Sequence, residues 1–263
     1  MKWRGYRQSG NVTDKRGMGM GGIAGGGIGA VVIAIVAMLF GVNPGDILPP
    51  GEQQPQQQGQ VATANDTLAQ IAGAVLASTE DVWTAIFQQS GGQDYPEPEL
   101  VLFEGMVQSA CGMGQSAMGP FYCSRDQAVY IDLSFFNDLH NRFGANGDFA
   151  QAYVVAHEVG HHIQNVTGNL SHGGGNAASV EQELQADCLA GIWGFHAREQ
   201  QGFVEPGDLE EALGAASAIG DDRIQQQTQG RVVPESFTHG SSAQRIQAFR
   251  RGYQSGNPAD CGM

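Results

Sequence analysis

The chain has 263 residues, of which 41% are hydrophobic and only 15% are charged, and it contains 39 glycines. This composition allows a buried core and excludes a coiled coil or an acidic disordered tail. The formal net charge of −14 is unevenly spread: the first 16 residues carry a net +4, whereas the remainder carries eight arginines and 26 acidic residues, a net −18. Because so acidic a surface repels phosphate groups, we expect no nucleic acid among the partners.

Residues 21–42 are predicted to form one transmembrane helix. No charged residue occurs from Gly17 to Gly45, and the apolar stretch is long enough to cross a bilayer. A secretory signal peptide is the alternative, but the long basic segment before the stretch and the lack of an Ala-x-Ala site after Phe40 favour an uncleaved anchor. The positive-inside rule then places residues 1–20, a basic tail, in the cytoplasm and the C-terminal part of the chain outside it.

Residues 43–62 are rich in proline and glutamine, which predicts a flexible linker. A globular domain is expected to follow, from residue 63 to residue 263. Its first element is predicted to be a helix that begins at Asn65 or Asp66 and ends near Gln89, because apolar residues recur there with helical spacing.

Two strands are predicted next, Glu99–Phe103 and Ala128–Leu133, the second following a hairpin-like turn from Gly119–Cys123. Beyond Gly147 the pattern is mainly helical, so the fold class is predicted to be α+β, mostly helical with a small sheet. The alternation in Ala128–Leu133 fits two roles equally well. It is typical of a core strand, and also of an exposed sheet edge that binds an extended peptide.

The segment from His157 to His161 reads His-Glu-Val-Gly-His, an H-E-x-x-H motif. Apolar residues at four-residue steps predict that it lies on a helix, with Asp148 as a candidate N-cap paired with Gln151. Side chains four residues apart project from the same helix face, so His157 and His161 can reach one metal ion. The motif therefore predicts a metal site.

Glu183 is predicted to be the third metal ligand, since a catalytic zinc usually has three protein ligands and one open position. Glu183 and Asp187 lie four residues apart on a predicted helix from Ala177 to about Gln200, and so share a face. We assign Glu183 to the metal and Asp187 to a hydrogen bond with a ligand imidazole, which would fix the imidazole tautomer. Glu181 is the alternative ligand.

Glu158 is the candidate general base, because its side chain is rotated by about 100° from His157 and suits a water on the metal rather than the metal itself. His239 is the candidate second donor to the oxyanion, with helix capping or loop packing as its alternative roles. Tyr130 and Tyr153 are further candidates for this donor. His162 adjoins the motif but is rotated away from His161, so we expect a supporting or surface position rather than ligation.

Four cysteines lack the spacing of a zinc finger and are interpreted as two disulfides, provided that the domain lies outside the cytoplasm. Cys111 with Cys123 closes a short glycine-containing loop, which leaves Cys188 with Cys261 as the second pair. This is one of three possible pairings.

Several segments resemble the neutral zinc metallopeptidases of bacterial membranes, in addition to the short basic start and the glycine-rich stretch after it. These segments are Ala110–Gly114, Gly119–Cys123, Val129–Phe136, Ala156–Asn165, Glu183–Trp193 and Phe237–Arg245. The resemblance implies a zincin-like domain, one zinc ion at His157, His161 and Glu183, and Glu158 as the catalytic base. Together with the predicted anchor, it implies a single-pass protein of the bacterial inner membrane.

Two other functions compete with that of a membrane-anchored zinc endopeptidase acting on peptides or proteins. One is a non-catalytic, zinc-stabilised binding or assembly module of the cell envelope, and the other is a membrane scaffold paired through glycines of the transmembrane stretch. Glu158 favours the enzyme over the module, because a structural zinc site needs ligands but no base.

Overall fold

The computed structural model describes residues 1–17, 66–92, 94–170 and 173–263. The predicted transmembrane helix and linker therefore lie outside the described residues. In the described ranges no helix is both long enough and apolar enough to cross a membrane.

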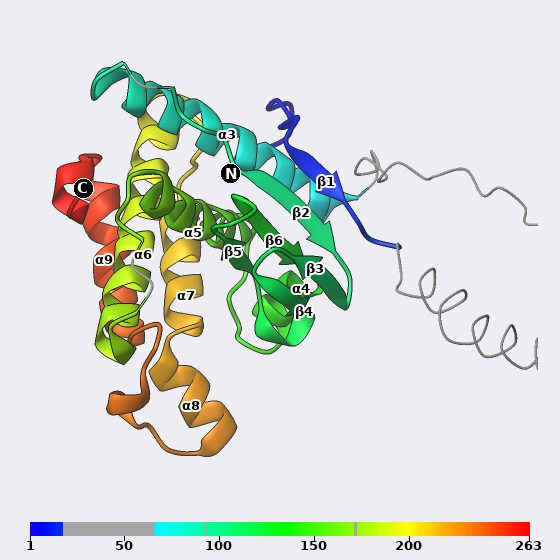
Figure 1. Ribbon diagram of the computed structural model, residues 1–263, viewed down its shortest axis with the longest axis vertical. Coiled ribbons are helices and arrows are strands. Elements are labelled where there is room, and N and C mark those ends of the chain that lie inside the picture. The colour runs from blue at the N-terminus through cyan, green and yellow to red at the C-terminus, as the bar shows by residue number, and fades with distance from the viewer. Residues whose placement is uncertain (18–65, 93, 171–172) are drawn as a thin grey trace, which may run out of the picture.

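The helices of the C-terminal half lie together on one side of the molecule and the small sheet on the other, while the first long helix runs across both (Figure 1), and this arrangement is consistent with the predicted α+β class. The strands are β1 (Val12–Asp14), β2 (Glu99–Phe103), β3 (Met106–Ser109), β4 (Gly112–Gln115), β5 (Phe121–Cys123) and β6 (Ala128–Asp132). The helices are α3 (Thr67–Gln89), α4 (Ser134–Asn141), α5 (Asp148–Val166), α6 (Gly175–Glu199), α7 (Asp208–Ala218), α8 (Asp221–Gln229) and α9 (Ser242–Ser255). Short 3₁₀ turns lie at Ser116–Met118, Pro234–Ser236 and Pro258–Cys261.

The main sheet has the strand order β1-β2-β6-β5. Strands β1, β2 and β6 run parallel, and β5 is antiparallel to β6 at one edge. Strands β3 and β4 form a separate antiparallel hairpin. Strand β6 is buried along its whole length because it pairs on both sides. Of the two roles left open for Ala128–Leu133, the structure therefore supports the core strand and excludes the exposed, peptide-binding edge, and the strand at the edge beside β6 is β5.

Helix α3 begins as the sequence predicts, since the Asp66 side chain accepts a hydrogen bond from the backbone N–H of Ala69. The capping predicted for α5 is wrong. Asp148 is the first residue of that helix, its N-cap is Gly147, and neither forms the expected side-chain cap. The backbone N–H of Phe149, in the first turn of the helix, instead donates to Glu211 Oε2 of α7 over 2.9 Å. A residue distant in sequence therefore satisfies this helix end.

Residues 1–17 are part of the folded domain. Strand β1 pairs with β2, and the buried Trp3 donates its indole N–H to Asp148 Oδ2 over 2.9 Å, while the α-ammonium group of Met1 lies 3.0 Å from Asp148 Oδ1. Of the tail expected at residues 1–20, residues 1–17 therefore pack against the domain, and residues 18–20 lie outside the described residues.

Glycines allow the helices around the motif to approach closely. A Cβ atom added at Gly160 would lie 2.8 Å from the carbonyl oxygen of Ala186, so α5 and α6 are in backbone contact beside the motif. A Cβ atom added at Gly191 of α6 would lie 2.1 Å from a carbonyl oxygen of α9. One added at Gly252 of α9 would lie 1.9 Å from a carbonyl oxygen of α6. Glycine at these positions therefore brings α5, α6 and α9 together.

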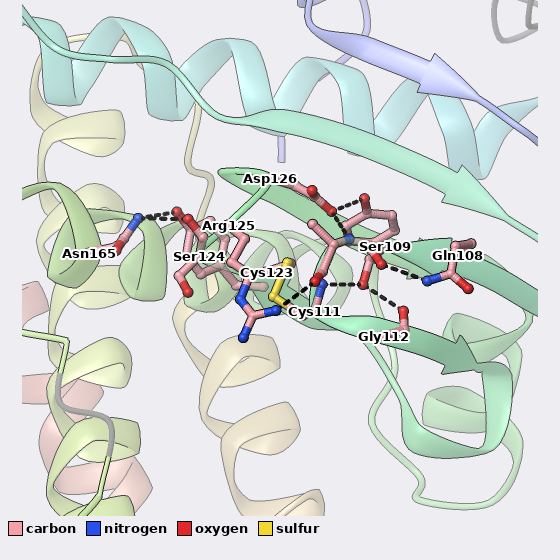
Figure 2. Close-up of a disulfide and its surroundings, with 12 residues drawn as sticks. Gln108, Ser109, Cys111, Gly112, Cys123, Ser124, Arg125, Asp126 and Asn165 are labelled. Atoms are coloured by element: carbon pink, nitrogen blue, oxygen red, sulfur yellow. Dashed lines mark hydrogen bonds between the residues drawn. A yellow bond between two sulfur atoms is a disulfide. The ribbon is translucent and has the colours of Figure 1, made fainter.

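Both predicted disulfides are present. Cys111 is bonded to Cys123, which ties the turn of the β3–β4 hairpin to the end of β5 (Figure 2). Cys188 is bonded to Cys261, which ties α6 to the C-terminal segment.

Candidate metal centre

Three side chains from two helices converge at the centre of the molecule. His157 and His161 come from α5 and Glu183 comes from α6, and one ligand atom of each lies within 4.8 Å of the others. His157 Nε2 is 3.1 Å from Glu183 Oε2, and His161 Nε2 is 3.4 Å from Glu183 Oε1. The structure thus brings together the three residues that the sequence assigned to the metal.

Asp187 orients the first imidazole. Its Oδ1 atom lies 2.8 Å from His157 Nδ1, and because an ionised carboxylate only accepts, Nδ1 carries the proton and Nε2 faces Glu183. Burial alone would raise the pKa of Asp187, but the charges of Arg245 and His157 lower it to about 2. Asp187 therefore stays ionised, in the position predicted for it.

Gln164 orients the second imidazole, a role that the sequence analysis did not predict. Its side-chain N–H groups donate to the carbonyl oxygen of Gln182 at 2.7 Å and to Gln185 Oε1 at 2.9 Å. The Gln164 Oε1 atom must then face His161 Nδ1, 2.8 Å away, and accept its proton. With Nδ1 protonated in both rings, Nε2 is in each case the nitrogen that faces Glu183 and that would bind a metal ion once it has lost its own proton.

Arg245 of α9 is a second residue of the site whose role the sequence did not predict. Its Nε and Nη2 atoms donate to the two oxygens of Asp187 at 2.8 Å and 2.9 Å, and Nη2 also donates to the Tyr153 hydroxyl at 3.0 Å. The Tyr153 hydroxyl in turn donates to Asp187 Oδ1 at 2.5 Å. Arg245, Asp187 and Tyr153 are all buried, so the arginine neutralises a carboxylate that would otherwise be an isolated buried charge.

Glu158 is next to the ligands but is not one of them. It is 7% exposed and lines the same cleft as His157 and His161. Burial raises the pKa of its carboxyl group, against the opposing charges of the two histidines. A raised pKa brings a carboxylate closer to the range in which a general base works at neutral pH.

The cleft around these residues has a volume of about 600 Å³. Besides the three ligands and Glu158, its lining includes His239, Arg245 and side chains of β5, together with apolar residues. These apolar residues include Met118, Phe135, Val154, Leu170, Ile219 and Ile224.

The donor set fits zinc. Two imidazole nitrogens and one carboxylate are protein ligands that a catalytic zinc takes, and such a zinc would bind water as its fourth ligand. Hydrogen bonds from His157 and His161 lower the pKa of Glu183 well below its usual value although burial opposes this, so the carboxylate is ionised. For His157, burial lowers the pKa, but Asp187 and Glu183 raise it to about 10. The carboxylate charge that favours a proton here equally favours a divalent cation.

The other predicted residues take different positions. His239 lines the cleft with its side chain 52% exposed, and its Nδ1 is 3.2 Å from Asp221 Oδ1. Glu181 lines a separate cavity beside Cys188 and Cys261 rather than the metal cleft. Tyr130 donates its hydroxyl proton to Asp126, and Tyr153 donates its own to Asp187. Neither tyrosine lines the cleft, so neither is placed to bind an oxyanion there.

His162 is fully buried, which excludes the surface position considered for it, and it is not among the converging ligands. Its Nε2 lies 2.5 Å from the carbonyl oxygen of Pro96, and its Nδ1 lies 2.9 Å from the Tyr122 hydroxyl. Burial lowers the pKa of His162 to about 4, so the ring is neutral at neutral pH.

The fold and the converging side chains define an α+β protein with a zinc-type site, and comparison with known families agrees. The family described as "Putative neutral zinc metallopeptidase" matches residues 1–263, and the chain belongs to that family.

Among its relatives, the Escherichia coli K12 protein YpfJ is 48% identical over 282 aligned positions, which cover 99% of this chain and 98% of YpfJ. The Mycobacterium tuberculosis H37Rv protein Rv2575 is 42% identical over 253 positions, which cover 86% of this chain and 84% of the relative. Both relatives are described as uncharacterized. No solved structure matches the chain.

Proposed function

We propose that this protein is a zinc-dependent endopeptidase. The observation that carries the proposal is the convergence of His157, His161 and Glu183 in an open cleft, with Glu158 beside them and outside the ligand set. A zinc site that only stabilises a fold closes all four positions with protein ligands and needs no neighbouring base. The arrangement therefore favours catalysis over a non-catalytic binding module.

Zinc held by these three side chains would supply a Lewis acid that polarises a peptide carbonyl and lowers the pKa of water. Glu158 takes the proton of the attacking water and then gives it to the leaving amine. His239, held by Asp221 at the cleft, is the proposed second donor to the oxyanion. Gln164 and Asp187 keep the two imidazoles in the tautomer that binds metal.

Strand β5 is the proposed binding edge for the substrate backbone. It is the last strand of the main sheet, it pairs on one side with β6, and Phe121 and Tyr122 line the cleft that holds the ligands. An extended peptide binds readily to such an edge by adding a strand. Pairing of an extended substrate segment along a strand edge suits cleavage within a chain, which is why we propose an endopeptidase.

The proposed location is the extracytoplasmic side of the bacterial plasma membrane. Two disulfides support this, because disulfides persist in oxidising compartments and are rare in the cytoplasm. Residues 1–17 belong to the same folded unit and share that location. Membrane attachment through residues 21–42 stays a prediction. In this proposal, residues 1–17 and the C-terminal part of the chain lie on the same side of the membrane, in place of the opposite sides expected from the charge pattern.

The test uses the full chain, because β1 and Trp3 are part of the fold. We would incubate the zinc-loaded protein with a diverse peptide library, beside Glu158→Ala, and identify cleavage products by mass spectrometry. We expect the variant to keep its zinc and lose at least about 100-fold in cleavage rate, since it lacks the base. Glu181→Ala, on α6 but outside the cleft, is the matched control and should cleave normally. A folded, zinc-bound wild type without cleavage would contradict the proposal and favour the binding module.

A further inference from the structure

A polar cluster joins the metal-binding helix α5 to the edge strand β5. The Tyr122 hydroxyl of β5 is 2.9 Å from His162 Nδ1 and 2.9 Å from Asn165 Nδ2, both on α5. Asn165 also donates to the carbonyl oxygen of Ser124, just after β5, at 3.4 Å (Figure 2). The middle residue of β5 is thus bonded to the helix that carries His157 and His161.

The hydrogen bonds of this cluster have one consistent arrangement. The carbonyl oxygen of Pro96 can only accept, so His162 Nε2 carries the proton and Nδ1 of the neutral ring accepts from the Tyr122 hydroxyl. The Tyr122 oxygen then accepts from the Asn165 amide. The rings of Tyr122 and Tyr95 each contact His162 edge-on, at 5.5 Å and 5.7 Å between ring centres. The phenol of Tyr122 is therefore held in one orientation.

A second set of contacts holds the far end of β5. Cys123 is bonded to Cys111 of the β3–β4 hairpin. The turn after β5 is hydrogen-bonded to the same hairpin. Asp126 accepts from the N–H of Ala110 at 2.8 Å, and Arg125 donates to the Ala110 carbonyl oxygen at 3.1 Å (Figure 2). Strand β5 is only three residues long and pairs with β6 alone in the described part of the sheet. Short edge elements open easily, so these attachments decide where β5 lies.

We propose that Tyr122 is a positioning residue for substrate: through its hydroxyl, His162 and Asn165 of the metal-binding helix hold β5 at the place where an extended peptide pairs with it. The inference rests on the proposed peptidase function. It explains why His162, the second histidine of the pair at 161–162, is buried against β5 and is not among the converging metal-ligand candidates. The hydrogen bonds of Tyr122 with His162 and Asn165 set how tightly a long peptide binds and do not act on the proposed zinc ligands.

Tyr122→Phe tests the proposal, because it removes the hydroxyl and keeps the ring that lines the cleft. For a peptide long enough to pair along β5, we expect KM to rise about fivefold, as expected for one lost hydrogen bond, with kcat within about twofold. For a short blocked substrate that does not reach along β5, both constants should stay unchanged. Zinc content should also stay unchanged. Tyr6→Phe, which removes a hydroxyl bonded to Asp81 on the N-terminal segment, is the control.

Amide hydrogen exchange of residues 121–123, in zinc-loaded wild type and Tyr122→Phe, gives a readout without catalysis. We expect faster exchange in the variant at β5 and unchanged exchange in α5. Unchanged exchange at β5, or an equal rise of KM for long and short substrates, would overturn the inference while the peptidase function stands. A wild type that cleaves no peptide would overturn the peptidase function, and the role of Tyr122 in substrate binding with it.

Discussion

At the scale of single residues, the metal centre depends on side chains that orient the ligands as much as on the ligands. His157 and His161 each have a buried acceptor at Nδ1, Asp187 for one and Gln164 for the other. The spacing of Glu183 and Asp187 on one helix face made Asp187 predictable. Gln164 was not predictable, because its role depends on Gln182 and Gln185 of the neighbouring helix. Arg245 was likewise hidden, since it reaches Asp187 only where α9 crosses α6.

Gln164→Leu is expected to weaken zinc binding by about 10- to 100-fold, because His161 loses the acceptor that fixes its tautomer. Zinc affinity would be measured by competition with a chromophoric chelator, and circular dichroism would establish that the fold is retained. Gln151→Leu is the matched control, since it makes the same change on α5 away from the ligands. Equal zinc affinity in wild type and Gln164→Leu would show that the hydrogen bond does not orient His161.

At the scale of elements, the prediction from sequence was accurate where local chemistry determines the structure. The α3 helix and the strands β2 and β6 lie where periodicity predicts them, and Asp66 caps α3. The start of α5 was mispredicted because its end is satisfied by Glu211 of another helix. The sequence left the position of β6 open between core and edge, because alternation does not reveal how many neighbours a strand has. Close helix crossings at glycines were equally invisible in the sequence.

Gly252→Ala is expected to lower the free energy of unfolding by about 1–3 kcal/mol or more, because the added methyl group would overlap the backbone of α6 at Cys188. Chemical denaturation of the zinc-loaded protein would measure this change. Gly214→Ala on α7 is the control: no atom lies within 4 Å of the added methyl group, so alanine should stabilise that helix by up to about 1 kcal/mol. A Gly252→Ala protein as stable as wild type would show that α6 and α9 can separate without cost.

At the scale of the whole molecule, the N-terminal segment and the rest of the domain form one unit. Strand β1 completes one side of the main sheet, and Trp3 is buried in the core that α5 also lines. The charge pattern alone indicated a cytoplasmic tail, since the positive-inside rule counts basic residues and takes no account of tertiary contacts. Arg7 and Arg16 are in fact paired with acidic residues of the domain, Asp81 for Arg7 and Asp66 for Arg16.

Residues 2 and 231 are expected to lie in the same compartment. Lys2→Cys and Arg231→Cys place single thiols at two exposed positions of the folded unit, and a membrane-impermeant thiol reagent applied to intact cells would report their location. We expect both variants to be labelled, in intact and in lysed cells alike. Labelling of residue 231 with protection of residue 2 in intact cells would instead support a single crossing and contradict the packing of residues 1–17.

The sequence by itself predicted the candidate site of this protein: the two histidines, the proposed third ligand and the proposed base follow from residue types and their spacing along helices, and the observed disulfides are one of the three pairings that the sequence allowed. Those features depend on neighbours close in the chain, or on ligand chemistry that few residue types satisfy. Only the tertiary structure decided which strand is the open edge, which residues orient the imidazoles, and that residues 1–17 belong to the domain. Each of these depends on contacts between segments far apart in sequence, which local patterns do not encode.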